Sequence, residues 1–175
     1  MVIPVDKSIV LLGFMGSGKS TLGNQLAASL GWTFIDIDRF IEADENRTIP
    51  EIFEKDGEST FRKLESNALN RLLTYTSQVI SVGGGAPCSP GNLELIKEKS
   101  LSIYLRISKP QLLVRLTGSS TQRPLLKGKS EFETQSLIAD LLAFREPFYL
   151  QADIIIESDE ITTGMILSEL VKGTD

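Results

Sequence analysis

The segment at residues 13–20 constrains the fold of this chain more than any other feature. It reads Gly-Phe-Met-Gly-Ser-Gly-Lys-Ser and matches G-x-x-x-x-G-K-[ST], the pattern of a phosphate-binding loop. The apolar run at residues 9–12 predicts a buried strand before it. Residues 21–30 after it carry leucines at helical spacing, and Gly31 ends that pattern. A strand, a glycine loop and a helix in this order indicate a nucleoside triphosphate site.

The residue types in this loop suit phosphate chemistry. Its glycines let successive backbone N–H groups point at phosphate oxygens, and the following helix adds the positive end of its dipole. Lys19 is expected to reach the β- and γ-phosphates, and Ser20 to offer its hydroxyl to Mg²⁺. The alternative is a glycine-rich turn with a lysine placed by chance, but the flanking strand and helix favour the phosphate site. The predicted nucleotide-binding residues are Gly13, Gly16, Ser17, Gly18, Lys19, Ser20 and Thr21.

The composition excludes several classes of protein. With 175 residues, 41% of them hydrophobic, the chain is expected to form one globular domain over residues 1–175. The net charge of −5 argues against a general nucleic-acid binder, which would show a basic face. The chain has no histidine, which excludes histidine-based hydrolase triads and histidine metal sites. A general base would have to be a carboxylate, a lysine, a tyrosine, the cysteine or water.

The cellular location is predicted from the same inventory. No apolar run approaches the ~18 residues of a membrane span, and the stretch before residue 9 is too short for a signal peptide. Cys88 is the one cysteine, so no intramolecular disulfide can form, and we expect it to be a small buried apolar residue. These features predict a cytoplasmic protein without membrane partners.

Short apolar segments alternate with helical patterns along the chain. Several of the segments are apolar throughout, as parallel strands covered on both faces are, and the connections are long enough for helices. Helices are predicted over residues 61–73, in a short segment that starts at Pro50 and in another that starts at Pro110. The sequence therefore predicts a three-layer α/β fold with a five-stranded parallel sheet. Its predicted strands are residues 9–12, 33–35, 79–82, 101–105 and 154–156.

Two carboxylates follow the second predicted strand. Asp36 and Asp38 are expected at the carboxyl edge of the sheet, where such folds bind ligands, and the phosphate loop follows the first strand at that edge. One carboxylate can enter the magnesium shell, and the other can orient and deprotonate a hydroxyl. The alternative is that Asp38 is the N-cap of a helix beginning at Arg39, and the two roles are compatible.

Further candidate site residues come later in the chain. The glycines at residues 83–85 follow the third strand and allow close backbone approach to a ligand, although a flexible turn is the alternative. Arg62 and Glu65 are three apart on a predicted helix, so their side chains can meet. Sequence spacing alone does not bring Arg145 to Arg62. The polar segment at about residues 118–132 is expected to form a mobile lid, with a plain surface loop as the alternative.

These motifs together resemble those of the shikimate kinases. The phosphate loop is shared by many kinases, whereas the series that follows it is far more specific in its order and spacing. The resemblance runs from residue 13 to the last helix, through Asp36-Ile37-Asp38, Phe61-Arg62 with Glu65, the triple glycine, Arg123-Pro124-Leu125-Leu126, and Arg145 with Tyr149.

The resemblance implies a fold, a reaction and a cofactor. The fold would be that of the nucleoside monophosphate kinases, a P-loop kinase fold with sheet order 2-3-1-4-5. The reaction would be ATP-dependent phosphorylation of the 3-hydroxyl of shikimate, giving shikimate 3-phosphate and ADP in chorismate and aromatic amino acid biosynthesis. Mg²⁺ would be held by Ser20 and Asp36. Separately, we expect the protein to be a monomer.

The resemblance also implies roles for matching residues. Arg62 and Arg145 would bind the carboxylate of shikimate, with Glu65 holding Arg62 in place. Asp38 would bind the ring hydroxyls, and Arg123 on the lid would reach the transferring phosphates. The implied catalytic residues are Lys19, Asp38 and Arg123. The implied shikimate-binding residues, centred on about residues 36–66, are Asp38, Phe53, Phe61, Arg62, Glu65, Gly84, Gly85 and Arg145.

The sequence departs from the family pattern at the adenine side. Leu116 follows Arg115 where many members have an arginine that stacks on adenine, and residues 157–160 lack a proline that some members have. Alternative acceptors are gluconate and the nucleoside monophosphates. A binding-only paralogue is disfavoured because Lys19 and both strand-end carboxylates are present.

Overall fold

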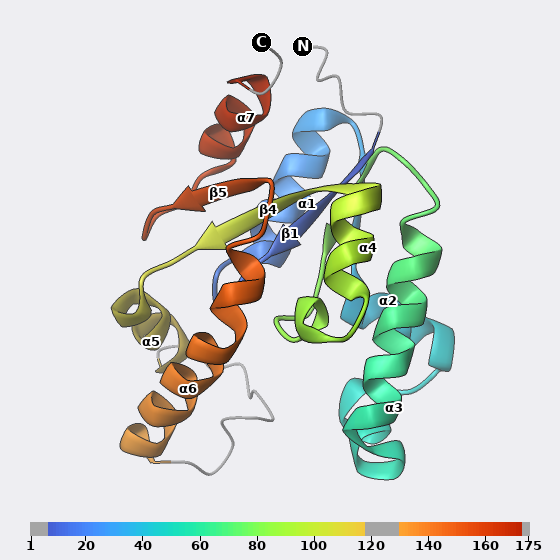
Figure 1. Ribbon diagram of the computed structural model, residues 1–175, viewed down its shortest axis with the longest axis vertical. Helices are drawn as coiled ribbons and strands as arrows, with labels where there is room; N and C mark the ends of the chain where they lie inside the picture. The colour runs from blue at the N-terminus through green and yellow to red at the C-terminus, as the bar shows by residue number, and fades with distance from the viewer. Residues whose placement is uncertain (1–6, 118–129, 173–175) are drawn as a thin grey trace.

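Five parallel strands form one sheet with helices on both of its faces (Figure 1). The computed structural model describes residues 7–117 and 130–172. The sheet order is β2-β3-β1-β4-β5, which confirms the predicted order and each of the predicted strands. The strands are β1 (Ser8–Leu12), β2 (Thr33–Asp36), β3 (Gln78–Ser81), β4 (Ser100–Arg106) and β5 (Ile154–Glu157).

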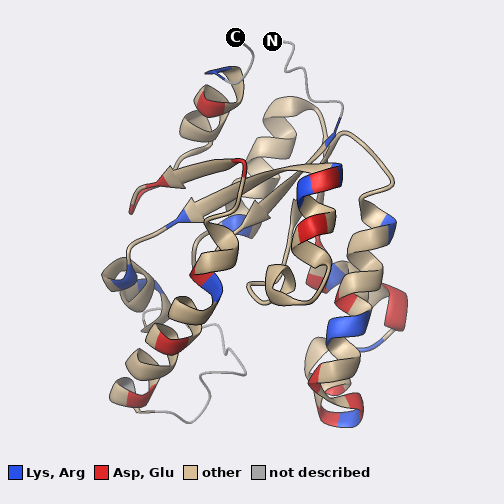
Figure 2. Cartoon of the chain, viewed as in Figure 1, with Lys and Arg blue, Asp and Glu red and all other residues tan. Residues whose placement is uncertain are grey.

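The centre of the sheet is the core of the molecule. All five residues of β1 are buried, because this strand lies between β3 and β4 and under helices on both faces. Its apolar run therefore needs no alternation of polar and apolar residues. Charged side chains gather on the helices, while most of the sheet carries none (Figure 2).

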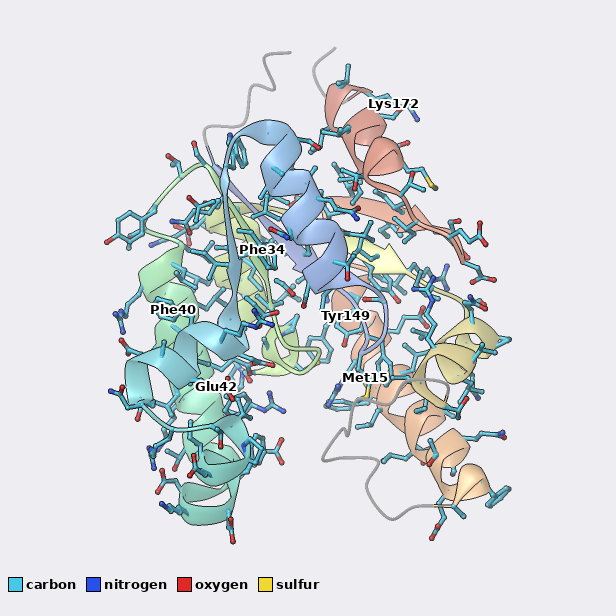
Figure 3. All side chains as sticks on the ribbon, turned by 180° about the vertical axis from the view of Figure 1, so that it is seen from behind. Met15, Phe34, Phe40, Glu42, Tyr149 and Lys172 are labelled. Carbon is cyan, nitrogen blue, oxygen red and sulfur yellow. The ribbon has the colours of Figure 1, made fainter. Side chains whose placement is uncertain are left out.

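The helices are divided between the two faces. One face is covered by α1 (Lys19–Leu30) with α7 (Thr163–Lys172) beside it, and the other by α4 (Asn92–Lys99) (Figures 1 and 3). On the side of α4 lie α3 (Ile49–Leu72) and α6 (Glu131–Tyr149), which both contact the short 3₁₀ helix η1 (Ala86–Cys88). The remaining helices are α2 (Ile37–Glu45), packed on α3, and α5 (Lys109–Thr117), packed on α6.

Helix α3 contains a kink that separates the two helices expected in this region. Gly57 has φ 78° and ψ 171°, a conformation that is essentially restricted to glycine. The first segment starts at a capping box, in which the Thr48 hydroxyl accepts from the Glu51 N–H and the Glu51 carboxylate accepts from the Thr48 N–H. Pro50 occupies its first turn, as predicted.

Two local details differ from those considered in the sequence. The N-cap of α2 is Asp36, so the alternative role of Asp38 as the cap is wrong: the Asp36 carboxylate accepts from the Asp38 N–H at 3.2 Å, and Asp38 already lies in the first turn. The predicted lid is also too long at its end. Ser130 caps α6, so residues 131 and 132 are helical. In the part of the chain that the structure describes, no helix is both long and apolar enough to cross a bilayer.

Candidate active site

The carboxyl ends of three neighbouring strands meet at one edge of the sheet. The phosphate loop follows β1, Asp36 ends β2, and the glycines at residues 83–85 follow β3. Residues from all three segments line one pocket. The parallel arrangement thus assembles groups far apart in the chain, as ligand sites in open α/β sheets require.

The phosphate loop holds its lysine over the turn. Lys19 Nζ donates to the carbonyl oxygens of Gly13 and Phe14, at 2.8 and 2.9 Å. Gly18 precedes the first residue of α1 in a left-handed conformation, so the helix N-terminus opens toward the pocket. A concave loop of backbone amides, a helix N-terminus and an ammonium group together form a site for a polyphosphate.

Two oxygens converge beside this loop. Ser20 Oγ donates to Asp36 Oδ2 at 2.8 Å, and both residues line the pocket of the phosphate loop. A hydroxyl and a carboxylate next to a phosphate site match the few protein ligands that Mg²⁺ takes when it keeps water and phosphate oxygens in its shell. The donor set therefore fits the predicted cation.

Asp38 presents a carboxylate to the same pocket. Its Oδ1 is buried and accepts no hydrogen bond from any described residue. Burial, and next the charge of Asp36, raise the pKa of Asp38, while Lys19 opposes this shift. A partly buried carboxylate with an open acceptor position and a raised pKa can orient a hydroxyl and accept its proton.

The triple glycine lies between two pockets. Gly83 and Gly84 line the phosphate pocket, and Gly85 lines a second pocket with Arg62 and Arg145. A Cβ added to Gly85 would lie 2.7 Å from Arg62 Nη2, a separation that real Cβ atoms essentially never show. The absent side chain thus leaves room for the Arg62 guanidinium, and close approach of a ligand to this turn stays a prediction.

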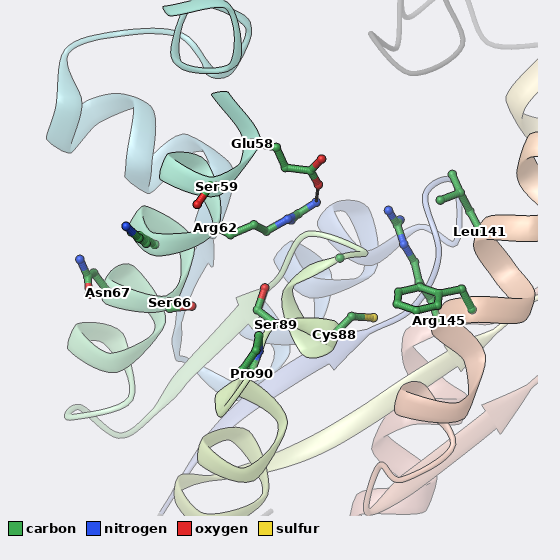
Figure 4. A pocket seen from close by; sticks show the side chains of 13 residues that line it. Glu58, Ser59, Arg62, Ser66, Asn67, Cys88, Ser89, Pro90, Leu141 and Arg145 are labelled. Carbon is green, nitrogen blue, oxygen red and sulfur yellow. Dashed lines mark hydrogen bonds and ion pairs between the residues drawn. The ribbon is translucent and has the colours of Figure 1, made fainter. Parts of the chain in front are cut away.

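The fold brings together the two arginines that sequence spacing left apart. Arg62 reaches into the second pocket from α3 and Arg145 from α6, on opposite sides, with Cys88 and Ser89 between them (Figure 4). Arg145 is buried, and its guanidinium carbon lies 5.8 Å from the centre of the Phe14 ring. Two cations facing one space form a site for an anion.

Glu65 fixes the position of the Arg62 guanidinium from outside the arginine pocket. Its carboxylate is fully buried and accepts from Arg62 Nη1 at 2.8 Å, which confirms that the two side chains meet. Glu58 accepts from the same guanidinium at 3.1 Å but is largely exposed. Burial raises the pKa of Glu65 to about 7, although Arg62 opposes the shift.

An aromatic pair borders this region across the kink of α3. The rings of Phe53 and Phe61 lie 4.7 Å apart between centroids, and Phe61 is buried while Phe53 is partly exposed. The Arg62 guanidinium lies 5.3 Å from the centre of the Phe61 ring. The predicted wall residues thus stand beside the predicted arginine.

Other predicted residues have different outcomes. Arg123 lies outside the described residues, as does most of the predicted lid. Cys88 is only half-buried and lines the arginine pocket, so the expectation of a buried apolar residue was wrong. Leu116 is buried, with its side chain against Gly16, because it faces the phosphate loop from α5.

The contacts of two residues at this edge were not predicted from the sequence. Arg115 donates to the carbonyl oxygens of Gly16 and Asp159, at 3.2 and 2.5 Å. Tyr149 donates to the carbonyl oxygen of Gly84. Tyr149 stands in a motif that was noted, but neither contact joins residues close in sequence, so no local pattern could reveal it.

Known proteins resemble this chain over nearly its whole length. A family model described as shikimate kinase matches residues 15–174. The chain is 38% identical to the shikimate kinase of Parabacteroides distasonis over 157 residues. This aligned region covers 90% of this chain and 91% of that protein.

Solved structures extend the likeness to the fold. The crystal structure of shikimate kinase from Bacteroides thetaiotaomicron matches with a TM-score of 0.89 and 38% identity, covering 95% of this chain and 98% of that one. The shikimate kinase from Acinetobacter baumannii in complex with shikimate matches with a TM-score of 0.87 and 35% identity, covering 96% and 94%. A gluconokinase from Sinorhizobium meliloti shares the fold alone, at 19% identity and a TM-score of 0.59 over 96% and 91% of the two chains. The chain therefore belongs to the shikimate kinase family.

Proposed function

We propose that this shikimate kinase transfers the γ-phosphate of ATP to the 3-hydroxyl of shikimate, with Asp38 accepting the hydroxyl proton. One observation carries the assignment of the site: the pocket lined by two opposed arginines adjoins, through the consecutive residues Gly84 and Gly85, the phosphate pocket in which Asp38 lies. A small carboxylic acid with ring hydroxyls fits that combination. The relative from Acinetobacter baumannii, solved with shikimate, supports the choice of acid.

The arginines recognise the acceptor. Planar guanidinium groups bind carboxylates through paired hydrogen bonds, and Arg62 is held for this by the buried Glu65. Phe53 and Phe61 contact the ring of the acceptor on the side of α3. With its carboxylate on the arginines, the acceptor would extend toward the phosphate pocket, where Asp38 lies, and so bring its hydroxyls to this carboxylate.

The chemical step follows from this placement. The acceptor oxygen forms a bond to the γ-phosphorus, the bond from that phosphorus to the bridging oxygen of ADP breaks, and Asp38 takes the hydroxyl proton. Lys19 and the loop amides neutralise charge on the phosphates, and Arg123 is proposed to join them. Mg²⁺, held by Ser20 and Asp36, would supply further neutralisation of the β- and γ-oxygens. That the protein is monomeric and cytoplasmic stays a prediction from the sequence.

Release of ADP from ATP with Mg²⁺ tests the proposal. Release should depend on shikimate, and gluconate, AMP, CMP and UMP should not replace it. Asp38→Asn should reduce kcat by about 10²- to 10⁴-fold, the usual contribution of a general base. The matched control is Asp44→Asn, which removes a surface carboxylate paired with Arg71 and should keep full activity. Turnover with another acceptor but not with shikimate would overturn the assignment.

A further inference from the structure

Tyr149 lies directly behind the site, and it is not among the residues that line either proposed substrate pocket. It is the last residue of α6, it is fully buried, and it lies in the middle of the molecule in the view from behind (Figure 3). Its hydroxyl donates to the carbonyl oxygen of Gly84, far away in the chain. The end of α6 is therefore fastened to the turn after β3.

Three groups meet at Gly84. A Cβ added to this glycine would lie 3.2 Å from Tyr149 Oη, 3.2 Å from Arg145 Nη1 and 3.5 Å from the Gly13 carbonyl oxygen. Burial raises the pKa of Tyr149 well above its ordinary value, although the positive charge of Arg145 opposes this. The phenol therefore keeps its proton, and with it the donor, at any working pH.

The last turn of α6 needs this attachment. Pro147 lies inside the helix and lacks the N–H that would bond one turn back, so the turn carrying both Arg145 and Tyr149 has lost a backbone hydrogen bond. Residues four apart share one face of a helix. Tyr149 and Arg145 therefore share one face of the same turn, so a contact that fixes the position of Tyr149 also fixes the position of Arg145.

We propose that Tyr149 is a positioning residue: its bond to the Gly84 carbonyl fixes the last turn of α6 and so sets the Arg145 guanidinium for the carboxylate of the acceptor. The inference rests on the proposed function, because it takes Arg145 as a ligand of that carboxylate. Tyr149 acts only through these two neighbours. Its loss should weaken binding of the acceptor and leave binding of ATP and the chemical step nearly unchanged.

The competing explanation is that Tyr149 only fills the core. Its ring packs on that of Tyr104, with centroids 5.1 Å apart. Tyr104 provides the matched control, because it is buried in the same aromatic pair while its hydroxyl lies 3.4 Å from Glu146 and away from Gly84. Removing either hydroxyl leaves both rings in place.

The experiment compares Tyr149→Phe with Tyr104→Phe in steady-state kinetics. Tyr149→Phe should raise KM for shikimate about five- to tenfold, with kcat and KM for ATP within about twofold of wild type. Tyr104→Phe should leave all three within about twofold. Equal effects of the two variants on KM for shikimate would show a packing role only and overturn the proposal.

Two further measurements keep the test decisive. Replacing the Tyr149 phenol with the aniline of 4-aminophenylalanine restores a donor and should restore KM for shikimate, even if Tyr149→Phe is too unstable to assay. Weak shikimate binding in that protein would overturn the proposal. Wild-type protein is measured in parallel, because failure of wild type to use shikimate refutes the proposed function, whereas an unchanged KM in Tyr149→Phe refutes this inference alone.

Discussion

The carboxylate of Glu65 lies fully buried behind Arg62 and accepts its Nη1 hydrogen bond at 2.8 Å. The other carboxylate oxygen, Oε1, is buried against Gly83 and accepts no hydrogen bond from any described residue. One oxygen of this carboxylate therefore makes a strong charged hydrogen bond, while the other is buried without a hydrogen bond to offset its lost hydration. This relationship links the geometry of the arginine pocket to pH and to stability.

Glu65→Gln should weaken shikimate binding. We expect KM for shikimate to rise about ten- to a hundredfold, since a hydrogen bond to a charged group contributes roughly 1.5–3 kcal/mol. Glu58→Gln removes a carboxylate from the same guanidinium, but Glu58 is largely exposed. It should change KM less than about fivefold, because exposed pairs contribute little. Steady-state kinetics on both variants check this, and equal effects would contradict the role given to Glu65.

Stability should fall as pH rises from about 4.5 to about 7. Burial raises the pKa of Glu65 from 4.5 to about 7, so in this window the folded protein keeps a proton that the unfolded chain has released. The unfolded state then binds fewer protons, and the free energy of unfolding decreases by about 3 kcal/mol at most from this group. Urea unfolding across this range measures it. Glu65→Gln should lose this component, and an identical pH slope in the variant would refute the assignment.

Gly85→Ala should disturb binding more than folding. The new Cβ would lie 2.7–2.9 Å from the Arg62 guanidinium, which can move because it is the end of a flexible side chain. We expect KM for shikimate to rise about tenfold or more, with a small change in Tm. Gly164→Ala, in α7, has only the Thr162 hydroxyl at 3.8 Å as a neighbour and should leave KM unchanged. A normal KM in Gly85→Ala would mean that Arg62 need not occupy this position.

Arg115→Ala should act on the nucleotide. Its guanidinium joins the carbonyl oxygens of Gly16 and Asp159, so its loss loosens the phosphate loop from the segment after β5. KM for ATP should rise about five- to tenfold, with KM for shikimate within about twofold. Arg71→Ala is the control, because Arg71 pairs with Asp44 on the surface. The reverse pattern, a change for shikimate only, would contradict this role.

Asp36→Asn should raise the Mg²⁺ requirement without unfolding α2. Asparagine caps helices about as well as aspartate, so the hydrogen bond to the Asp38 N–H can persist. The variant lacks the negative charge that we propose attracts Mg²⁺ to the site beside Ser20. A Mg²⁺ titration of activity should show half-saturation shifted upward by about tenfold or more. An unshifted titration together with an unchanged Tm would remove Asp36 from the metal site.

Several features could be predicted from the sequence because they depend on neighbours in the chain. The apolar runs of the strands are buried from both faces, and the glycine loop must stand between a strand and a helix. Arg62 and Glu65 meet because they are three apart on a helix. The sequence offered Asp38 as an alternative cap of α2, whereas the cap is Asp36, because both residues favour caps and the backbone decides which of them lies outside the helix.

The sequence by itself thus determined the fold class, the sheet order implied by the family resemblance, and a nucleotide loop. Only the tertiary structure decided that Arg145 faces Arg62, that Arg115 joins Gly16 to Asp159, and that Tyr149 anchors Gly84. Each of these contacts joins segments on different elements. Their geometry depends on how helices pack on the sheet, and no periodicity along the chain records that packing.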